Sequence, residues 1–308
     1  VAISVLFSNL LESAHNIAKI IKKVKSNTKI ILGGNHISSA VTDYKVAMID
    51  KNSKLPDFIA DLENEGKLLK KIDITDSATS DIVNSIPADL AVITADGTDK
   101  ATYAGAMVYA ADLEGKITKI NLTDSGTLYE STTLFNAESN TTNGRYIYKK
   151  PEATINNDSK LWLYFGTGNT EKLQNTPNEN RLYGIKDKDF PKFVTISSSG
   201  TIAECKTSPL SPQNTDLGWY VNLTNSQKVT AESTIDKDRV YFPLYEPTTG
   251  SNTCQTGKAI LTGYDLKCGI SVLYVDMGTG VVSKVVVQGD NLYIGIAGEA
   301  KKSISGFL

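Results

Sequence analysis

The chain is poor in the residues on which enzyme and metal chemistry most often depends. Its 308 residues include two His, three Cys, three Met and two Trp. Neither His stands in an H-E-x-x-H or other metal-binding spacing, and there is no G-x-S-x-G motif and no C-x-x-x-C-x-x-C cluster. Phe165-Gly166-Thr167-Gly168 is rich in glycine but lacks the Lys-Ser/Thr of a phosphate-binding loop. These absences predict a protein that is not an enzyme and has no cofactor.

Long apolar runs and an excess of one charge are also missing. The net charge is −2 and the isoelectric point is near 5.8, so the chain lacks the basic footprint of a nucleic-acid-binding protein. No apolar run reaches the roughly 18 residues that span a bilayer, which predicts no membrane span. There is no initiator Met and no signal peptide, and Val1 lies inside an apolar run, so we interpret the chain as a fragment.

The first part of the chain, residues 1–58, has the pattern of a βαβ segment. Residues 1–7 and 29–32 are apolar runs typical of buried parallel strands. Between them, apolar residues recur at helical spacing, with lysines on the other face. Residues 4–6 (Ser-Val-Leu) and Gly33-Gly34, separated by 26 residues, are similar to the S-x-L and GG motifs of cobalamin-binding domains that precede radical-SAM enzymes.

That resemblance is to a truncated fragment. The D-x-H-x-x-G loop that supplies the axial histidine of such domains is absent, and His15 and His36 stand elsewhere. We therefore predict no cobalamin binding and a loop role for His36. Two alternatives remain open: residues 29–50 form a strand pair of the following domain, or residues 1–58 are a foreign fragment.

The second part, residues 59–308, is predicted to be mainly β. Short aromatic and β-branched runs are bounded by Gly, Asn, Asp or Pro, as at residues 161–165, 239–242 and 291–294. An Asp-x-x-Gly-Lys turn at Asp112 lies 51 residues after a similar, longer segment at Asp61, with less regular copies at 263–269 and 276–280. Repeats of this length predict a partial or complete β-propeller with quinoprotein-like blades, in which Asp and Gly form the turns between strands.

Residues 60–300 also carry five motifs that resemble, in order, the C-terminal β-propeller of PilC/PilY-type tip adhesins of type IV pili. They are Tyr109-x-x-Asp112-Leu113-x-Gly115, Phe165-Gly-Thr-Gly168, Tyr183-Gly-Ile-x-Asp187, Gly218-Trp-Tyr-Val-Asn-Leu223 and Val240-Tyr-Phe242, followed by Cys254 and Gly257. The resemblance implies a non-catalytic, secreted module that supports pilus assembly and extension and surface attachment. It implies pilins or minor pilins and a host or abiotic surface as partners. It also implies export through the periplasm to the pilus tip at the cell surface.

Two kinds of site follow from the resemblance. The family's calcium loop corresponds to residues 92–100, where only Asp96 and Asp99 supply carboxylates, so the calcium site is degenerate. Secretion would place Cys205, Cys254 and Cys268 in an oxidising compartment, where Cys254–Cys268, a pair involving Cys205, or no disulfide are the alternatives. Trp162 and Trp219 are expected to be structural, because each lies in a strand-like apolar run.

Two other functions remain as alternatives. One is a truncated corrinoid-binding or radical-SAM-type protein fused to a propeller. The other is a secreted propeller with an unknown partner.

Overall fold

A computed structural model describes residues 2–4, 31–33, 72, 74, 82, 84–94, 105–123, 125–156, 159–176, 178–196, 202–204, 217–248, 256–267, 269–297 and 302–305. The chain divides into two compact units, Val1–Lys71 and Ile72–Leu308. The sequence had placed this division after residue 58. None of the elements in the described residues is a helix, and none of them could therefore cross a membrane as an apolar helix.

The described residues of the first unit form one pair of short strands. β1 (Ala2–Ser4) and β2 (Ile31–Gly33) pair in parallel, with Ile3 opposite Leu32. Parallel neighbours need a long crossover connection. The crossover, including the predicted helix, lies outside the described residues, as do His15, His36 and residues 34–58. The βαβ segment and its alternatives therefore stay predictions.

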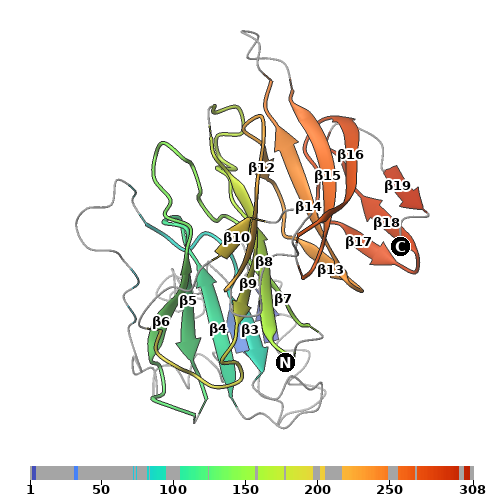
Figure 1. Ribbon diagram of the computed structural model, residues 1–308. Helices are drawn as coiled ribbons and strands as arrows, with labels where there is room; N and C mark the ends of the chain where they lie inside the picture. Colours follow the sequence, from blue (N-terminus) through green and yellow to red (C-terminus); the bar gives the residue numbers. More distant parts are fainter. Residues whose placement is uncertain are drawn as a thin grey trace, which may run out of the picture. The chain divides into compact units, whose positions relative to one another are not determined.

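The described residues of the second unit form four sheets that follow one another in chain order (Figure 1). The first sheet is an antiparallel meander of β3 (Ala91–Thr94), β4 (Ala106–Ala111), β5 (Lys116–Asn121) and β6 (Ser131–Asn136). The second has the order β10-β11-β9-β8-β7 and contains β7 (Glu152–Ile155), β8 (Leu161–Gly166), β9 (Arg181–Asp187), β10 (Ile202–Glu204) and β11 (Gly218–Asn222). All its pairs are antiparallel except β10 with β11.

The third and fourth sheets are antiparallel throughout. In the third, β12 (Lys228–Val229) and β13 (Thr234–Asp236) both pair with β14 (Arg239–Glu246), and β15 (Lys258–Asp265) and β16 (Ser271–Thr279) follow outward. The fourth contains β17 (Val286–Gln288), β18 (Asn291–Ile294) and β19 (Lys302–Ser305).

Neighbouring sheets pack face to face, with one hydrophobic core between each pair. Along β8, Leu161, Leu163 and Phe165 face the core shared with the first sheet. Trp162 and Tyr164 face the core shared with the third sheet. β14 repeats the alternation between the second and third cores. Because successive side chains of a strand point to opposite faces, a strand covered on both sides must be apolar along its length. This explains the continuous apolar runs at residues 161–165 and 240–245.

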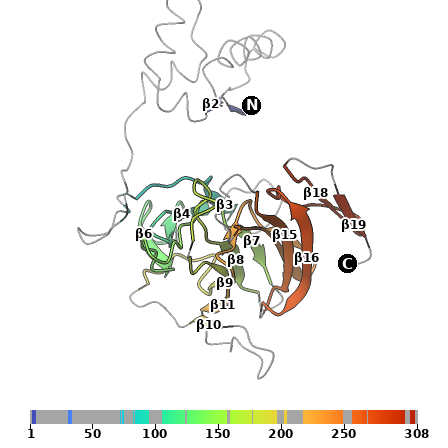
Figure 2. The same cartoon turned by 90° about the horizontal axis from the view of Figure 1, so that it is seen from above.

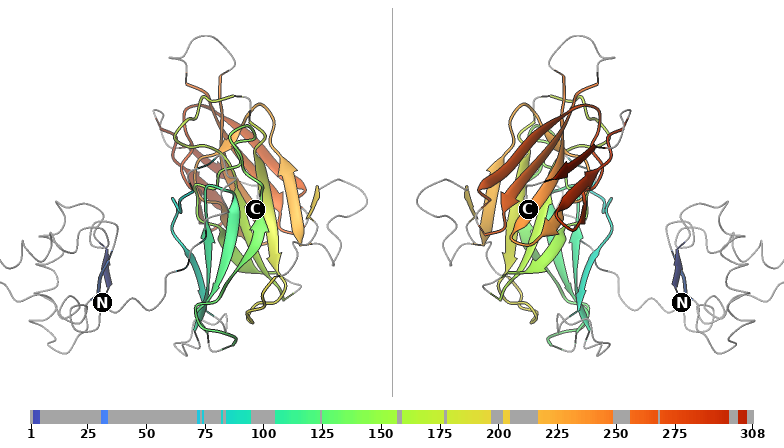
Figure 3. Two further views of the ribbon diagram at one scale, coloured as in Figure 1. Left: turned by 90° about the vertical axis from the view of Figure 1, so that its left-hand side faces the viewer. Right: turned by 90° about the vertical axis from the view of Figure 1, so that its right-hand side faces the viewer.

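The innermost strands of the sheets lie near one another. β7 lies close to both β3 and β13, whereas β6, β10 and β16 each form the outer edge of a different sheet. Seen from above, the sheets succeed one another from β3–β6 through β7–β11 to β15 and β16, then β18 and β19 (Figure 2). The first and fourth sheets lie at opposite sides of the unit (Figure 3). No strand in the described residues pairs the first sheet with the fourth. The mainly-β prediction is thus confirmed, and the closure of a propeller is not.

The turns predicted at Asp112 and at residues 263–269 are present, and a similar one occurs at Asp187. Asp112, Asp187 and Asp265 each follow a central strand, and the carboxylate of each accepts a hydrogen bond from a backbone N–H of the next turn. The distances are 2.9 Å to Lys116 N, 3.2 Å to Asp189 N and 2.9 Å to Lys267 N. Gly115 (φ 78°) and Gly269 (φ 67°) supply the left-handed backbone that ends the first and third turns. The turn chemistry predicted at Asp112 is confirmed.

The fourth copy of the repeat is confirmed only in part. The carboxylate of Asp276 accepts a hydrogen bond from Gly278 N at 2.9 Å, but both residues lie inside β16, and the strand expected at 281–287 is limited to β17. Gly278 (φ 96°) and Gly280 (φ 136°) adopt backbone conformations that interrupt extended structure there. The copy around Asp61 lies outside the described residues, so the 51-residue period is not tested.

Candidate functional site

Three groups of buried or partly buried charges connect neighbouring sheets of the second unit. They are the most distinctive polar features among the residues that the structure describes. Each joins segments that are far apart in the sequence.

The first group is a buried ion pair between the first and second sheets. Lys119 on β5 lies 2.7 Å from the carboxylate of Asp187, which ends β9, and both side chains are 1% exposed. Tyr109 on β4 donates a hydrogen bond to the same carboxylate at 2.7 Å, and Lys119 also donates to the carbonyl of Lys192 at 2.9 Å. Burial, with the nearby charge of Asp187, raises the pKa of Tyr109 well above its usual range. The phenol is therefore a fixed hydrogen-bond donor.

The second group surrounds Lys228, at the start of β12. This residue is fully buried, and its ammonium donates to three backbone carbonyls: Leu173 at 2.9 Å, Asn175 at 2.7 Å and Ser226 at 3.2 Å. Burial disfavours the charged ammonium and lowers the pKa of Lys228 to about 8. Two of the three carbonyls belong to the segment between β8 and β9. Lys228 therefore fastens that segment to the third sheet.

Further contacts hold the same segment. Gln174 donates to the Tyr245 hydroxyl at 2.7 Å, and Tyr245 in turn accepts a bond from Gly257 N at 2.8 Å. Gly168 belongs to the glycine-rich motif, and a Cβ there would lie 2.6 Å from the Cβ of Lys228. The glycines of this motif thus allow close packing around Lys228, which gives them a structural role.

The third group lies where the innermost strands begin. Lys284, just before β17, is 2.7 Å from Glu232, just before β13, and 3.3 Å from Glu152, the first residue of β7. Partial burial alone would lower the pKa of Lys284, but the combined effect of the two carboxylates is larger, and the pKa is raised. One ammonium therefore links three sheets.

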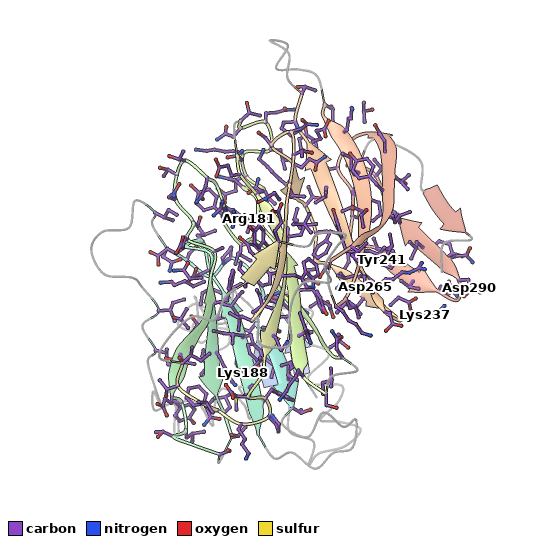
Figure 4. The ribbon with its side chains drawn as sticks, in the orientation of Figure 1. Arg181, Lys188, Lys237, Tyr241, Asp265 and Asp290 are labelled. Carbon is purple, nitrogen blue, oxygen red and sulfur yellow. The ribbon has the colours of Figure 1, made fainter. Side chains whose placement is uncertain are left out.

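A fourth contact joins the third and fourth sheets at their hairpin turns. Lys237, between β13 and β14, lies 3.4 Å from Asp290, between β17 and β18, and both side chains are largely exposed. Figure 4 shows these two residues on neighbouring turns.

None of these groups contains a site residue that was predicted from the sequence. Asp96, Asp99, Cys205, Cys254 and Cys268 are all outside the described residues, so the calcium and disulfide predictions stay predictions. Within the part of the chain that the structure describes, no group of three or more His, Cys, Asp or Glu side chains could hold a metal ion.

The prediction for the two tryptophans is confirmed. Trp162 in β8 and Trp219 in β11 are 3% and 0% exposed, and both belong to the core between the second and third sheets. The indole N–H of Trp219 donates to the carbonyl of Leu266 at 2.9 Å. Gly184 and Gly269 lie against its ring, where any Cβ would collide with it.

Comparisons with known proteins add little. No family model matches the chain, and no curated protein matches it. Among solved structures, the chain is similar to the computationally designed Ika4 protein, with 11% identity, 72% of this chain and 91% of that chain covered, and a TM-score of 0.32. BBS1N in complex with ARL6DN has 9% identity, with 67% of this chain and 58% of that chain covered and a TM-score of 0.26. BamB from Moraxella catarrhalis has 9% identity, with 69% of this chain and 80% of that chain covered and a TM-score of 0.20. Likenesses at these TM-scores carry no argument about this chain.

Proposed function

We propose that this chain is a non-catalytic β-propeller module of a PilC-type pilus-tip protein. In this role it is secreted and supports type IV pilus assembly and extension and surface attachment. Its partners are pilins or minor pilins and the host or abiotic surface to which the pilus attaches.

The observation that carries this proposal is the place of the five resembling motifs. The first spans the end of β4 and the Asp112 turn that leads into β5, while the second covers the end of β8. The third forms β9, the fourth forms β11, and the fifth lies in β14. Each motif thus occupies a core strand or its turn, as expected if the motifs specify blades.

The packing is a second line of support for a propeller. Successive sheets share one core each, and the innermost strands approach one another near the cluster of Lys284, Glu152 and Glu232. This is how radially arranged blades would pack.

The partners need a direct test. The purified chain should bind soluble pilin or minor-pilin domains saturably when it is immobilised on a sensor. An exported copy should restore surface pili in a piliated host that lacks its own PilC-type protein. Failure of both experiments would contradict the proposal.

The corrinoid alternative has one observation in its favour, the parallel pairing of β1 with β2. Equilibrium dialysis against hydroxocobalamin decides it. We expect no retention, and a stoichiometric complex would favour the alternative.

A further inference from the structure

Four asparagines of the chain stand in the sequence Asn-x-Ser/Thr, at which an oligosaccharide can be attached to an exported protein: Asn121, Asn140, Asn157 and Asn222. Asn140 alone among them has an acidic residue two positions earlier, and residues 138–142 read Glu-Ser-Asn-Thr-Thr. The acidic residue extends the acceptor sequence to Asp/Glu-x-Asn-x-Ser/Thr, the form that bacterial oligosaccharyltransferases use. The residues two positions before the other three asparagines are Lys119, Ile155 and Tyr220.

Asn140 lies in the connection between β6 and β7, which leads from the first sheet to the second (Figure 1). Glu138, Asn140 and residues 141–142 are exposed. The connection is fixed just beyond them, because Asn143 is 7% exposed and its amide donates to the carbonyl of Glu138 at 2.8 Å. The acceptor residues are therefore in solvent, on a turn with a fixed base.

The side chain of Asn140 is held through its oxygen. Oδ1 accepts hydrogen bonds from Thr142 N at 2.9 Å and from Asn143 N at 2.8 Å, which is the geometry of an Asx turn. These bonds do not use Nδ2, the atom to which a sugar would be attached. They also hold the acceptor asparagine and the hydroxyl residue Thr142 in one tight turn.

The amide of Asn121 is in a different situation. Its residue is fully buried, and Nδ2 donates to the carbonyls of Ser125 and Thr127 at 3.1 Å each. Oδ1 accepts from the backbone N–H and the hydroxyl of Thr123 at 2.9 and 2.7 Å. A transferase could not reach this nitrogen without unfolding β5.

Asn222 is exposed, but both ends of its amide have charged partners. Nδ2 donates to the carboxylate of Glu204 at 3.1 Å, and Oδ1 accepts from Arg181 at 2.8 Å. Asn157 lies outside the described residues. Within the part of the chain that the structure describes, acceptor sequence and surroundings therefore agree at Asn140.

We propose that Asn140 is an N-glycosylation site, at which an oligosaccharyltransferase attaches an oligosaccharide from a polyprenyl-pyrophosphate donor. Nδ2 of Asn140 forms a bond to C1 of the reducing-end sugar while the C1–O bond to pyrophosphate breaks. Polyprenyl pyrophosphate leaves, and the proton lost by Nδ2 passes to a base of the transferase. The Glu138 carboxylate offers the enzyme a charged group that an arginine can bind. This inference goes beyond the pilus function and requires only that the chain meets the transferase after export.

The test incubates the purified, folded chain with a single-subunit bacterial oligosaccharyltransferase and a polyprenyl-pyrophosphate-linked oligosaccharide. Intact-mass spectrometry should show one added oligosaccharide per chain, and glycopeptide sequencing should place it at Asn140. Asn140→Gln should abolish the transfer. Asn222→Gln is the matched control, because it removes another exposed acceptor sequence, and it should be modified like the unchanged chain.

Two further positions separate recognition from folding. Thr142→Ala removes the hydroxyl but keeps the backbone N–H that bonds Asn140, so the turn remains while transfer slows at least about tenfold. Thr142→Ser keeps a hydroxyl and should be modified like the unchanged chain. Glu138→Gln removes the charge at similar size and should also slow transfer at least about tenfold. Near-ultraviolet circular dichroism checks that each variant is folded.

A peptide of residues 136–144, incubated in parallel, shows which part of the inference fails if the chain is not modified. Transfer to neither the peptide nor the chain would mean that residues 138–142 are not an acceptor sequence. Transfer to the peptide alone would mean that the folded turn is not accessible. Transfer at another asparagine, or equal transfer to Thr142→Ala and the unchanged chain, would overturn the inference as well.

Discussion

Lys119 and Lys228 are both buried in the second unit, but their charges are stabilised in different ways. Lys119 contacts a carboxylate, Asp187, and the pair lies between the first and second sheets. Lys228 contacts three backbone carbonyls and fastens a connecting segment to the third sheet. Removal of Lys119 leaves a buried opposite charge, whereas removal of Lys228 leaves only dipoles. The two regions should therefore respond differently to mutation and to pH.

The core beside Lys228 provides the largest expected effect. Trp219→Ala removes a fully buried ring together with its bond to Leu266, so we expect a loss of roughly 3–5 kcal/mol in the free energy of unfolding. Urea unfolding measures it. Trp219→Phe keeps most of the apolar contact and should cost about 1–2 kcal/mol. A loss under about 1 kcal/mol for the alanine variant would place the ring on the surface.

The ion pair between the first and second sheets should come next. Lys119→Met leaves the Asp187 carboxylate buried, with Tyr109 and the backbone N–H groups of Asp189 and Phe190 as its remaining donors among the described residues. We expect a loss of about 3–4 kcal/mol in the free energy of unfolding. Lys188→Met, at the exposed neighbour of Asp187 labelled in Figure 4, is the control and should change stability by less than about 0.5 kcal/mol. Equal effects of the two variants would show that the pair does not stabilise this interface.

Lys228→Met sharpens the comparison. Three carbonyls lose a donor, but the cost of burying an ammonium also disappears. We expect a smaller loss, of about 1–3 kcal/mol. Lys172→Met, an exposed lysine of the same connecting segment, is the matched control. A loss as large as that of Lys119→Met would contradict the view that dipoles tolerate the substitution better than a buried carboxylate.

These lysines also show what the sequence could and could not predict. Lys119 lies two positions from Ile117 and from Asn121 in β5, so the three side chains share one face of the strand, and Ile117 places that face toward the first core. Its partner Asp187 was identified only as the last residue of the Tyr183-Gly-Ile-x-Asp187 motif, and nothing indicated that the two residues would meet. No such signal existed for Lys228. Its acceptors at Leu173 and Asn175 are backbone carbonyls more than 50 positions earlier, and any residue type supplies a carbonyl.

The strands were more predictable than the sites. Continuous aromatic runs identified β8 and β14, because both faces of each strand are covered. The fourth repeat was predicted only in part, because Asp276 bonds Gly278 N as in the other copies but both residues lie within a long strand. Edge strands such as β10 depend on distant pairing, and three residues carry no periodicity of their own.

The pH dependence of stability should distinguish the contribution of Lys228 from that of the buried tyrosines, because the two contributions change in different pH ranges. The pKa of Lys228 is about 8 in the folded chain against an ordinary 10.5, so between these values the unfolded chain holds more protons. Stability therefore rises with pH across this window. Burial raises the pKa of Tyr109, Tyr183 and Tyr264 above 10.0, so their contribution is lost as pH rises past 10. Urea midpoints should rise from pH 8 toward 10 and then fall, and Lys228→Met should remove the rise alone.

The cluster at Lys284 should give the smallest effect. Its side chain is 42% exposed and those of Glu152 and Glu232 are 32% and 26% exposed, so solvent screens the three charges. Lys284→Gln should therefore cost less than about 1 kcal/mol in low salt, and the cost should shrink further in about 1 M salt. Lys237→Gln is the matched control, because its pair with Asp290 is longer and more exposed and should contribute even less. A salt-independent loss of about 2 kcal/mol or more at Lys284 would instead mean that this ammonium, like Lys119, neutralises charges that water does not reach.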